Sequence, residues 1–149
     1  MKKKFWLVIL AAACVIGLDQ WTKQWAYMQL QTRDIVVLRN WFSLTYVTNT
    51  GAAFGLLAGM NLPFLLFGLG TLVYLGYWFL TGDRLMGHGY LRICYGVTMG
   101  GVIGNLIDRV VRGAVVDWIE ISFFSIFNLA DMAMSVGVLF MIIYIFFRR

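Results

Sequence analysis

Residues 128–147, NLADMAMSVGVLFMIIYIFF, are apolar almost throughout and contain a single charged side chain, that of Asp131. A helix needs about 20 mainly apolar residues to cross the hydrocarbon core of a bilayer. Three other stretches have this length and character, at about residues 5–26, 62–80 and 91–111. The pattern predicts one all-α membrane domain over residues 1–149 with four transmembrane helices.

The composition of the whole chain agrees with a membrane protein. Of its 149 residues, 61% are hydrophobic and 13% are charged, whereas about 25% of the residues of a typical soluble domain are charged. The net charge of +5 comes largely from residues 2–4 and 148–149 at the two ends. Such clusters do not form the basic stripe that nucleic acids bind, so we expect no nucleic-acid partner.

The sequence contains no recognisable set of metal ligands. Cys14 and Cys94 lie inside apolar stretches without a CxxC spacing, and His88, the sole histidine, falls in a polar connection. Metal sites require clustered cysteines, histidines or carboxylates at short spacings. We therefore expect no metal site.

The start of the chain has two interpretations. Residues 1–4, MKKK, lead into an apolar run with alanines at 11–13 before Cys14, a pattern that is also typical of a cleavable export signal. However, the apolar run continues past Cys14 and is followed by Trp21 and Trp25, which are typical of a membrane interface. We therefore expect this stretch to be retained as the first membrane helix.

The distribution of lysine and arginine predicts the orientation, because these residues are enriched in cytoplasmic segments. With both termini cytoplasmic, that side holds Lys2, Lys3, Lys4, Arg84, Arg92, Arg148 and Arg149. The opposite side holds Arg33, Arg39, Arg112 and, at a helix end, Arg109. The excess predicts two cytoplasmic termini and two extracytoplasmic segments, at about residues 28–61 and 112–127.

The first extracytoplasmic segment also predicts a small β element. Residues 35–38 and 42–47 are rich in β-branched and aromatic side chains and are separated by a short connection. Strand-like runs also occur at residues 115–116 and 119–123. Because an open sheet edge cannot face lipid, we expect a small sheet at the outer interface that serves as a platform.

Polar side chains at membrane depth recur at spacings of three or four residues. Ionisable groups in this environment cost about 2.5 to 3.5 kcal/mol each on insertion scales and are usually functional. The sets that share a helix face are Asp19 with Lys23, Asn105 with Asp108 and Arg109, and Asn128 with Asp131. All lie near the outer ends of their predicted helices, which indicates one polar site.

Simpler structural roles exist for each of these sets. Asp19 and Lys23 have the spacing of a helical ion pair, and Asn128 has the position of a helix N-cap. Asp108 with Arg109 would anchor a helix end or hold a loop. The small residues of 49–54, NTGAAF, permit close approach of a ligand or form a tight turn.

A pair of carboxylates is the chemistry that these residues support best. The sequence has no serine–histidine pair on one side of the membrane, no HExxH and no phosphate-binding loop. Two close carboxylates share one proton, so that one activates water and the other polarises a scissile carbonyl. The candidates are Asp19, Asp108, Asp117 and Asp131. Asp117 and Asp131 are weakly favoured, because the other two each have a neighbouring basic residue.

Five elements of the sequence resemble those of bacterial lipoprotein signal peptidases (signal peptidase II). They are Asp19-Gln20-Trp21-Thr22-Lys23, similar to DQxxK; Asn49-Thr50-Gly51-Ala52-Ala53-Phe54, similar to NxGAAF; Gly104-Asn105-Leu106-Ile107-Asp108-Arg109, similar to GNxxDR; Val115-Val116-Asp117-Trp118, similar to VVDF; and Phe127-Asn128-Leu129-Ala130-Asp131, similar to FNxAD. Each element alone is unspecific, but all five occur in the family's order. Trp118 departs from the family's usual phenylalanine, so we expect an altered pocket shape.

The resemblance implies a bacterial inner-membrane aspartyl peptidase without a cofactor. Asp117 and Asp131 are implied as the catalytic pair. The residues implied to bind substrate or shape the site are Asn49, Gly51, Asn105, Arg109, Asn128, Asp108, Asp19 and Lys23. The implied partners are membrane lipids and prolipoproteins with a diacylglyceryl-modified cysteine, which the enzyme, expected to be a monomer, cleaves just before that cysteine.

Two other functional classes compete with the peptidase. A small proton-coupled membrane carrier also uses intramembrane aspartate and arginine, but it needs them near the midplane, and the inner halves of the predicted helices have almost none. A non-enzymatic membrane adaptor would tolerate the loss of either aspartate. We therefore expect a peptidase.

Overall fold

Four helices and one small sheet make up the protein, as seen in a computed structural model that describes residues 2–51, 57, 59–81 and 88–147. The helices are α1 (Lys2–Leu30), α2 (Asn61–Thr81), α3 (Gly89–Val111) and α4 (Leu129–Phe147). The strands are β1 (Ile35–Leu38), β2 (Phe42–Asn49) and β3 (Val115–Ile121). The predicted combination of four helices with a small β element is therefore confirmed.

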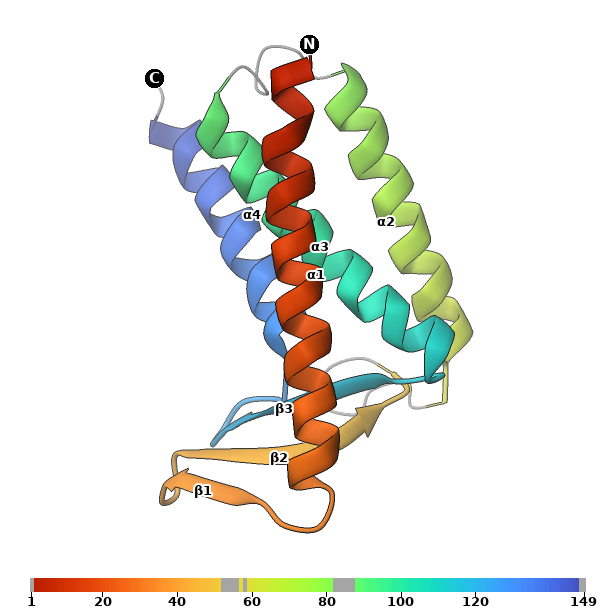
Figure 1. Cartoon of the computed structure of the whole chain (residues 1–149), viewed down its shortest axis with the longest axis vertical. Helices are drawn as coiled ribbons and strands as arrows, with labels where there is room; N and C mark the ends of the chain where they lie inside the picture. Colours follow the sequence, from red (N-terminus) through yellow and green to blue (C-terminus); the bar gives the residue numbers. More distant parts are fainter. Residues whose placement is uncertain (1, 52–56, 58, 82–87, 148–149) are drawn as a thin grey trace.

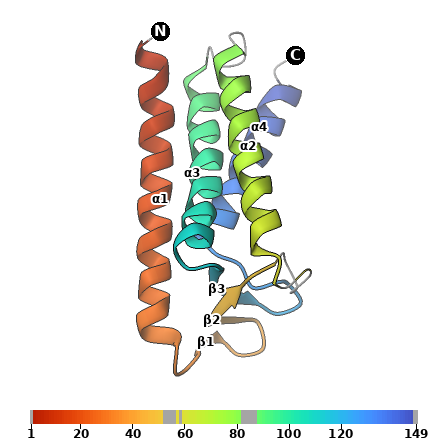
Figure 2. The ribbon, with the colours of Figure 1, turned by 90° about the vertical axis from the view of Figure 1, so that its right-hand side faces the viewer.

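The helices form a bundle that carries the sheet at one end. The beginning of α1 and the end of α4 lie together at the opposite end of the bundle (Figure 1). In the view of Figure 2, helix α3 lies between α1 and the other two helices. Helix α3 packs against all three. The sheet end is therefore where side chains from α1, α3 and α4 can meet strand residues.

Glycines allow α3 to approach α1 and α4 closely. A Cβ atom on Gly100 would lie 2.8 Å from the carbonyl oxygen of Ala12 in α1. A Cβ atom on the next residue, Gly101, would lie 2.5 Å from the carbonyl oxygen of Ala130 in α4. Small residues at helix contacts permit such backbone approach. As a result, short polar side chains on the three helices reach one another.

Three of the described helices are long and apolar enough to cross a membrane, over Phe5–Leu30, Asn61–Thr81 and Leu129–Phe147. Helix α3 has 23 residues, but Arg92, Asn105, Asp108 and Arg109 make it more polar than the others. Asn105, Asp108 and Arg109 bond other parts of the protein, and α3 packs against the other three helices, so it needs less apolar surface than a lone span. The sequence predicts four membrane-spanning helices. The described residues contain four helices, of which three are long and apolar enough to cross a membrane.

The sheet is antiparallel, with the strand order β1-β2-β3. Strands β1 and β2 are joined by a tight turn in which Asn40 adopts a left-handed conformation, with φ of 66°; asparagine tolerates this region better than most residues. Strand β3 comes from the distant 112–127 segment and pairs with β2, with Val47 opposite Asp117 and Asn49 opposite Val115. This register puts Asn49 beside Asp117.

Candidate active site

Asp117 and Asp131 line the same cavity, although they belong to different elements. Asp117 is the third residue of β3 and is 3% exposed, and Asp131 lies in the first turn of α4. The cavity has a volume of about 510 Å³. Its polar wall also includes Asn49, Gly51, Asn105 and Arg109, and its apolar wall includes Phe64, Met132 and Val136. A mostly apolar cavity with a few convergent polar groups is the usual form of a binding site.

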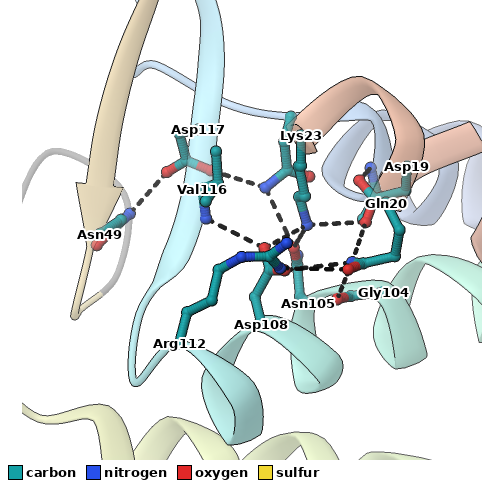
Figure 3. Close-up of polar contacts among 12 residues, drawn as sticks. Asp19, Gln20, Lys23, Asn49, Gly104, Asn105, Asp108, Arg112, Val116 and Asp117 are labelled. Carbon is teal, nitrogen blue, oxygen red and sulfur yellow. Dashed lines mark hydrogen bonds and ion pairs between the residues drawn. The ribbon is translucent and has the colours of Figure 1, made fainter. Parts of the chain in front are cut away.

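Two asparagines hold the carboxylate of Asp117. The amide nitrogen of Asn49 donates to Asp117 Oδ2 at 3.0 Å (Figure 3), and that of Asn128 donates to Asp117 Oδ1 at 2.7 Å. Asn49 comes from β2 and Asn128 from the start of α4, so the carboxylate is fixed from two sides. Each oxygen keeps a second lone pair for water or substrate.

A reciprocal pair of hydrogen bonds holds Asp131 at the start of α4. The backbone N–H of Asp131 donates to Asn128 Oδ1 at 3.0 Å, and the backbone N–H of Asn128 donates to Asp131 Oδ2 at 3.2 Å. This is the arrangement of a capping box, with aspartate at the third helical position. The predicted N-cap role of Asn128 is therefore confirmed. Asn105 donates to the other oxygen, Asp131 Oδ1, at 2.8 Å.

Asn128 connects the two carboxylates directly. Its side-chain nitrogen bonds Asp117, while its backbone N–H and its side-chain oxygen bond Asp131. The same nitrogen also donates to Asn105 Oδ1 at 3.1 Å. Asn128 therefore holds both carboxylates at one wall of the cavity, where the negative charge of Asp131 acts on Asp117.

The pKa of Asp117 is raised from 3.8 to about 6. Burial is the largest cause, because it disfavours the charged form, and the negative charge of Asp131 is the second. The hydrogen bonds from Asn49 and Asn128 act in the opposite direction, because they stabilise the carboxylate. Asp117 can therefore carry a proton at a pH at which an exposed aspartate is ionised.

We expect Asp117 to lose its proton as the pH rises through about 6 in the substrate-free protein. Asp131→Asn should lower this midpoint, because it removes the neighbouring negative charge. Asn49→Ala should raise it, because it removes a donor that favours the charged form. The infrared carboxyl band of isotope-labelled aspartate, followed as a function of pH, measures both shifts. A midpoint unchanged by Asp131→Asn would contradict the electrostatic coupling of the two side chains.

A buried charged cluster lies behind the cavity, where Asp19, Lys23 and Asp108 are all fully buried. The predicted ion pair is confirmed, with Lys23 Nζ 2.8 Å from Asp19 Oδ2. The same nitrogen lies 2.9 Å from Asp108 Oδ2 and donates to Asn105 Oδ1 at 2.9 Å (Figure 3). These three charged residues are not among the described residues that line the cavity.

Asp108 and Arg109 make separate contacts, although they are adjacent in the sequence. Asp108 bonds Lys23 and Arg112 in the buried cluster. Arg109 turns toward the cavity, where its Nη2 donates to the carbonyl oxygen of Gly51 at 2.9 Å and its Nη1 to Asn61 Oδ1 at 3.2 Å. Of the two roles considered for this pair, Asp108 anchors the end of α3, whereas Arg109 bonds Gly51 just after β2 and Asn61 at the start of α2.

Three polar residues that were not predicted as site residues bond residues of the site. Arg112 bonds Asp108, Gln20 donates to Asp108 Oδ1 at 3.2 Å, and Asn61 bonds Arg109. The contact between Arg112 and Asp108 could have been predicted from the sequence, because the two residues are four apart and so share a helix face. Gln20 is a fixed position of the DQxxK-like element and could have been identified from it, whereas Asn61 had no signal beyond its polarity beside an apolar stretch.

The prediction that Trp118 alters the shape of the pocket is wrong. Trp118 is absent from the described cavity lining, because successive residues of a strand point to opposite faces and Asp117 takes the cavity side. The indole instead packs edge-on against Trp25 of α1, with 5.9 Å between ring centroids. A change at this position therefore affects the contact between the sheet and α1.

Residues 11–147 match the family model described as signal peptidase (SPase) II. The chain belongs to the signal peptidase II family. Proteins named lipoprotein signal peptidase are similar over most of their length: one from Clostridioides difficile is 40% identical and covers 95% of each chain. Another, from Geobacillus thermodenitrificans, is 41% identical over 93% of this chain and 88% of its own.

A solved structure described as a bacterial membrane enzyme has the same fold. It superposes with a TM-score of 0.80 at 31% sequence identity and covers 93% of this chain and 87% of its own. Membership of the signal peptidase II family favours a protease over the proton-coupled carrier. The site described above is thus the candidate active site of a signal peptidase II.

Proposed function

We propose that this protein is an aspartic endopeptidase that removes the signal peptide from diacylglyceryl-modified prolipoproteins by cleaving just before the modified cysteine. The observation that carries the proposal is the connection of Asp117 and Asp131 through Asn128 at the wall of an apolar cavity. Family membership supports the signal-peptide substrate. The paired carboxylates support the aspartic type of chemistry.

In the proposed mechanism, Asp117 and Asp131 share one proton. The ionised carboxylate takes a proton from water, and the water oxygen attacks the carbonyl carbon of the scissile peptide bond. The protonated carboxyl donates a hydrogen bond to the carbonyl oxygen and so stabilises the charge that develops there. Breakdown of the tetrahedral intermediate then breaks the C–N bond, and a proton passes to the leaving amine of the cysteine.

The surrounding residues have two proposed roles. Asn49, Asn105 and Asn128 orient the carboxylates by the hydrogen bonds described above. Arg109 holds Gly51 at the cavity wall and lies over the ring of Phe64, with its Cζ 5.0 Å from the ring centroid. Asp19, Lys23 and Asp108 shape the site from behind. We propose that a monomer is sufficient, since one chain supplies both carboxylates and the asparagines that bond them.

We propose that all four helices cross the bacterial inner membrane, with both termini in the cytoplasm and the sheet and cavity on the extracytoplasmic side. The excess of lysine and arginine at the terminal end supports this orientation. The apolar cavity wall includes Phe64 of α2 and Met132 and Val136 of α4. These side chains suit a substrate that enters from the bilayer with its lipid attached.

The proposal is tested with the purified chain in lipid bicelles and a synthetic precursor peptide that carries a diacylglyceryl group on its cysteine. We expect cleavage before the cysteine, identified by mass spectrometry of both products. The matched control is the same peptide with an unmodified cysteine, which we expect to remain intact. Proton flux into liposomes without cleavage would contradict the proposal and favour the carrier.

A further inference from the structure

Lys23 is buried behind the cavity and uses its full hydrogen-bonding capacity on three acceptors. These are Asp19 Oδ2, Asp108 Oδ2 and Asn105 Oδ1, at 2.8, 2.9 and 2.9 Å (Figure 3). An ammonium group has three protons, so none remains for water or substrate. Lys23 therefore organises other groups and does not touch the reacting atoms.

The first acceptor carboxylate reaches the strand that carries Asp117. Asp108 Oδ2, which bonds Lys23, also accepts the backbone N–H of Val116 at 3.1 Å. Val116 is fully buried and directly precedes Asp117. This hydrogen bond fixes the backbone of β3 one residue before Asp117, whose side chain lines the cavity.

The second acceptor carboxylate reaches the helix that carries Asp131. Asp19 Oδ1 accepts the backbone N–H of Ala130 at 3.0 Å, and Ala130 directly precedes Asp131. This N–H lies in the first turn of α4 and has no partner within the helix. A Cβ atom on Gly104 would lie 2.6 Å from Asp19 Oδ2, so glycine leaves the space that this carboxylate occupies.

The third acceptor orients a side chain that bonds Asp131 itself. Because the oxygen of Asn105 accepts from Lys23, its amide nitrogen faces Asp131 Oδ1, to which it donates at 2.8 Å. An amide with the opposite orientation would place two donors together. Lys23 is thus linked to the backbone before each aspartate and, through Asn105, to one carboxylate.

Such a buried cluster is not explained by stability alone. Lys23 and Arg112 balance the charges of Asp19 and Asp108. Desolvation of buried ions offsets much of their attraction, so apolar replacements are often equally stable. Geometry offers a better explanation, because the cluster connects three segments that are distant in the sequence.

We propose that Lys23 is a positioning residue that sets the relative placement of Asp117 and Asp131 by fixing the peptide groups before them. This inference rests on the proposed function, since it concerns the geometry of the proposed catalytic pair. Lys23 should therefore affect the chemical step and leave substrate binding unchanged.

The test is Lys23→Met, which keeps the unbranched side chain up to the ε position and removes the ammonium group with its charge and donors. In protein that remains folded, we expect kcat to fall about 100-fold, as for a small misplacement of reacting groups, with KM unchanged. The positive charge of Lys23 also lowers the pKa of Asp117. The alkaline limb of the pH–rate profile should therefore move to higher pH in the variant.

Tyr95→Phe is the control for a purely structural effect. Tyr95 is buried, and its hydroxyl donates to the carbonyl oxygen of Leu75, which links α3 to α2 away from the cavity. We expect this variant to unfold at a lower temperature and to keep the wild-type kcat and alkaline limb. Folded Lys23→Met protein with a wild-type kcat, or with a raised KM alone, would overturn the inference.

A second variant keeps the test decisive if Lys23→Met does not fold. Incorporation of lactic acid at position 130 replaces one backbone N–H by an ester oxygen and so removes the hydrogen bond to Asp19, while the side chain remains that of alanine. We expect a lower kcat here too, and a wild-type kcat would overturn the inference. Failure of the wild-type chain to cleave the lipidated precursor would instead contradict the proposed function.

Discussion

We expect Asp117→Asn to convert no detectable lipidated precursor, and we expect the same of Asp131→Asn. Asparagine has nearly the shape of aspartate, but it can neither accept a proton from water nor donate one to the leaving amine. Loss of one member of a catalytic pair reduces rates by at least about 10³-fold. Conversion of the precursor by each purified variant, compared with the wild type, measures the effect.

Asp34→Asn is the matched control for these two variants. Asp34 lies just before β1 and is exposed, so the same chemical change there should leave conversion unaltered. Membrane insertion and the unfolding temperature of all three variants establish that each is folded. Near-normal conversion by either cavity variant would show that the catalytic pair is wrongly assigned.

We expect Asn128→Ser to lower kcat about 100-fold or more while it preserves most of the stability of the protein. A serine hydroxyl can still cap α4, but it lacks the amide nitrogen that bonds Asp117. The carboxylate of Asp117 would then lose its connection to the start of α4. Misplacement of a reacting group by about 1 Å is sufficient for a loss of this size.

Asn128→Ala separates the two roles of this residue. Alanine removes the cap as well as the amide, so it should cost about 1 kcal/mol of stability beyond the serine variant. Chemical unfolding measures this difference, and steady-state cleavage measures kcat for both. If Asn128→Ser keeps the wild-type kcat, the link between the two carboxylates is not required for catalysis.

The positions of the helices and strands could be predicted from the sequence because their signals are local. A stretch such as residues 128–147 is apolar over the length of a bilayer, whichever neighbours it has. The observed α4, Leu129–Phe147, begins one residue later because Asn128 serves as its cap. Helix α1, Lys2–Leu30, extends beyond the predicted residues 5–26, since its last turns pack near the sheet and need not be apolar.

The sequence by itself determined four helices, a small β element and a set of polar residues near the outer ends of the helices. Hydrophobicity and residue spacing are local properties of the sequence and do not depend on how the helices pack. Only the tertiary structure decided which polar groups meet. The pairing of β2 with β3 brings Asn49 to Asp117, and the packing of α3 turns Asp108 toward Lys23 and Arg109 toward Gly51. Adjacent residues on a helix diverge by about 100°, so their partners depend on how the helices pack.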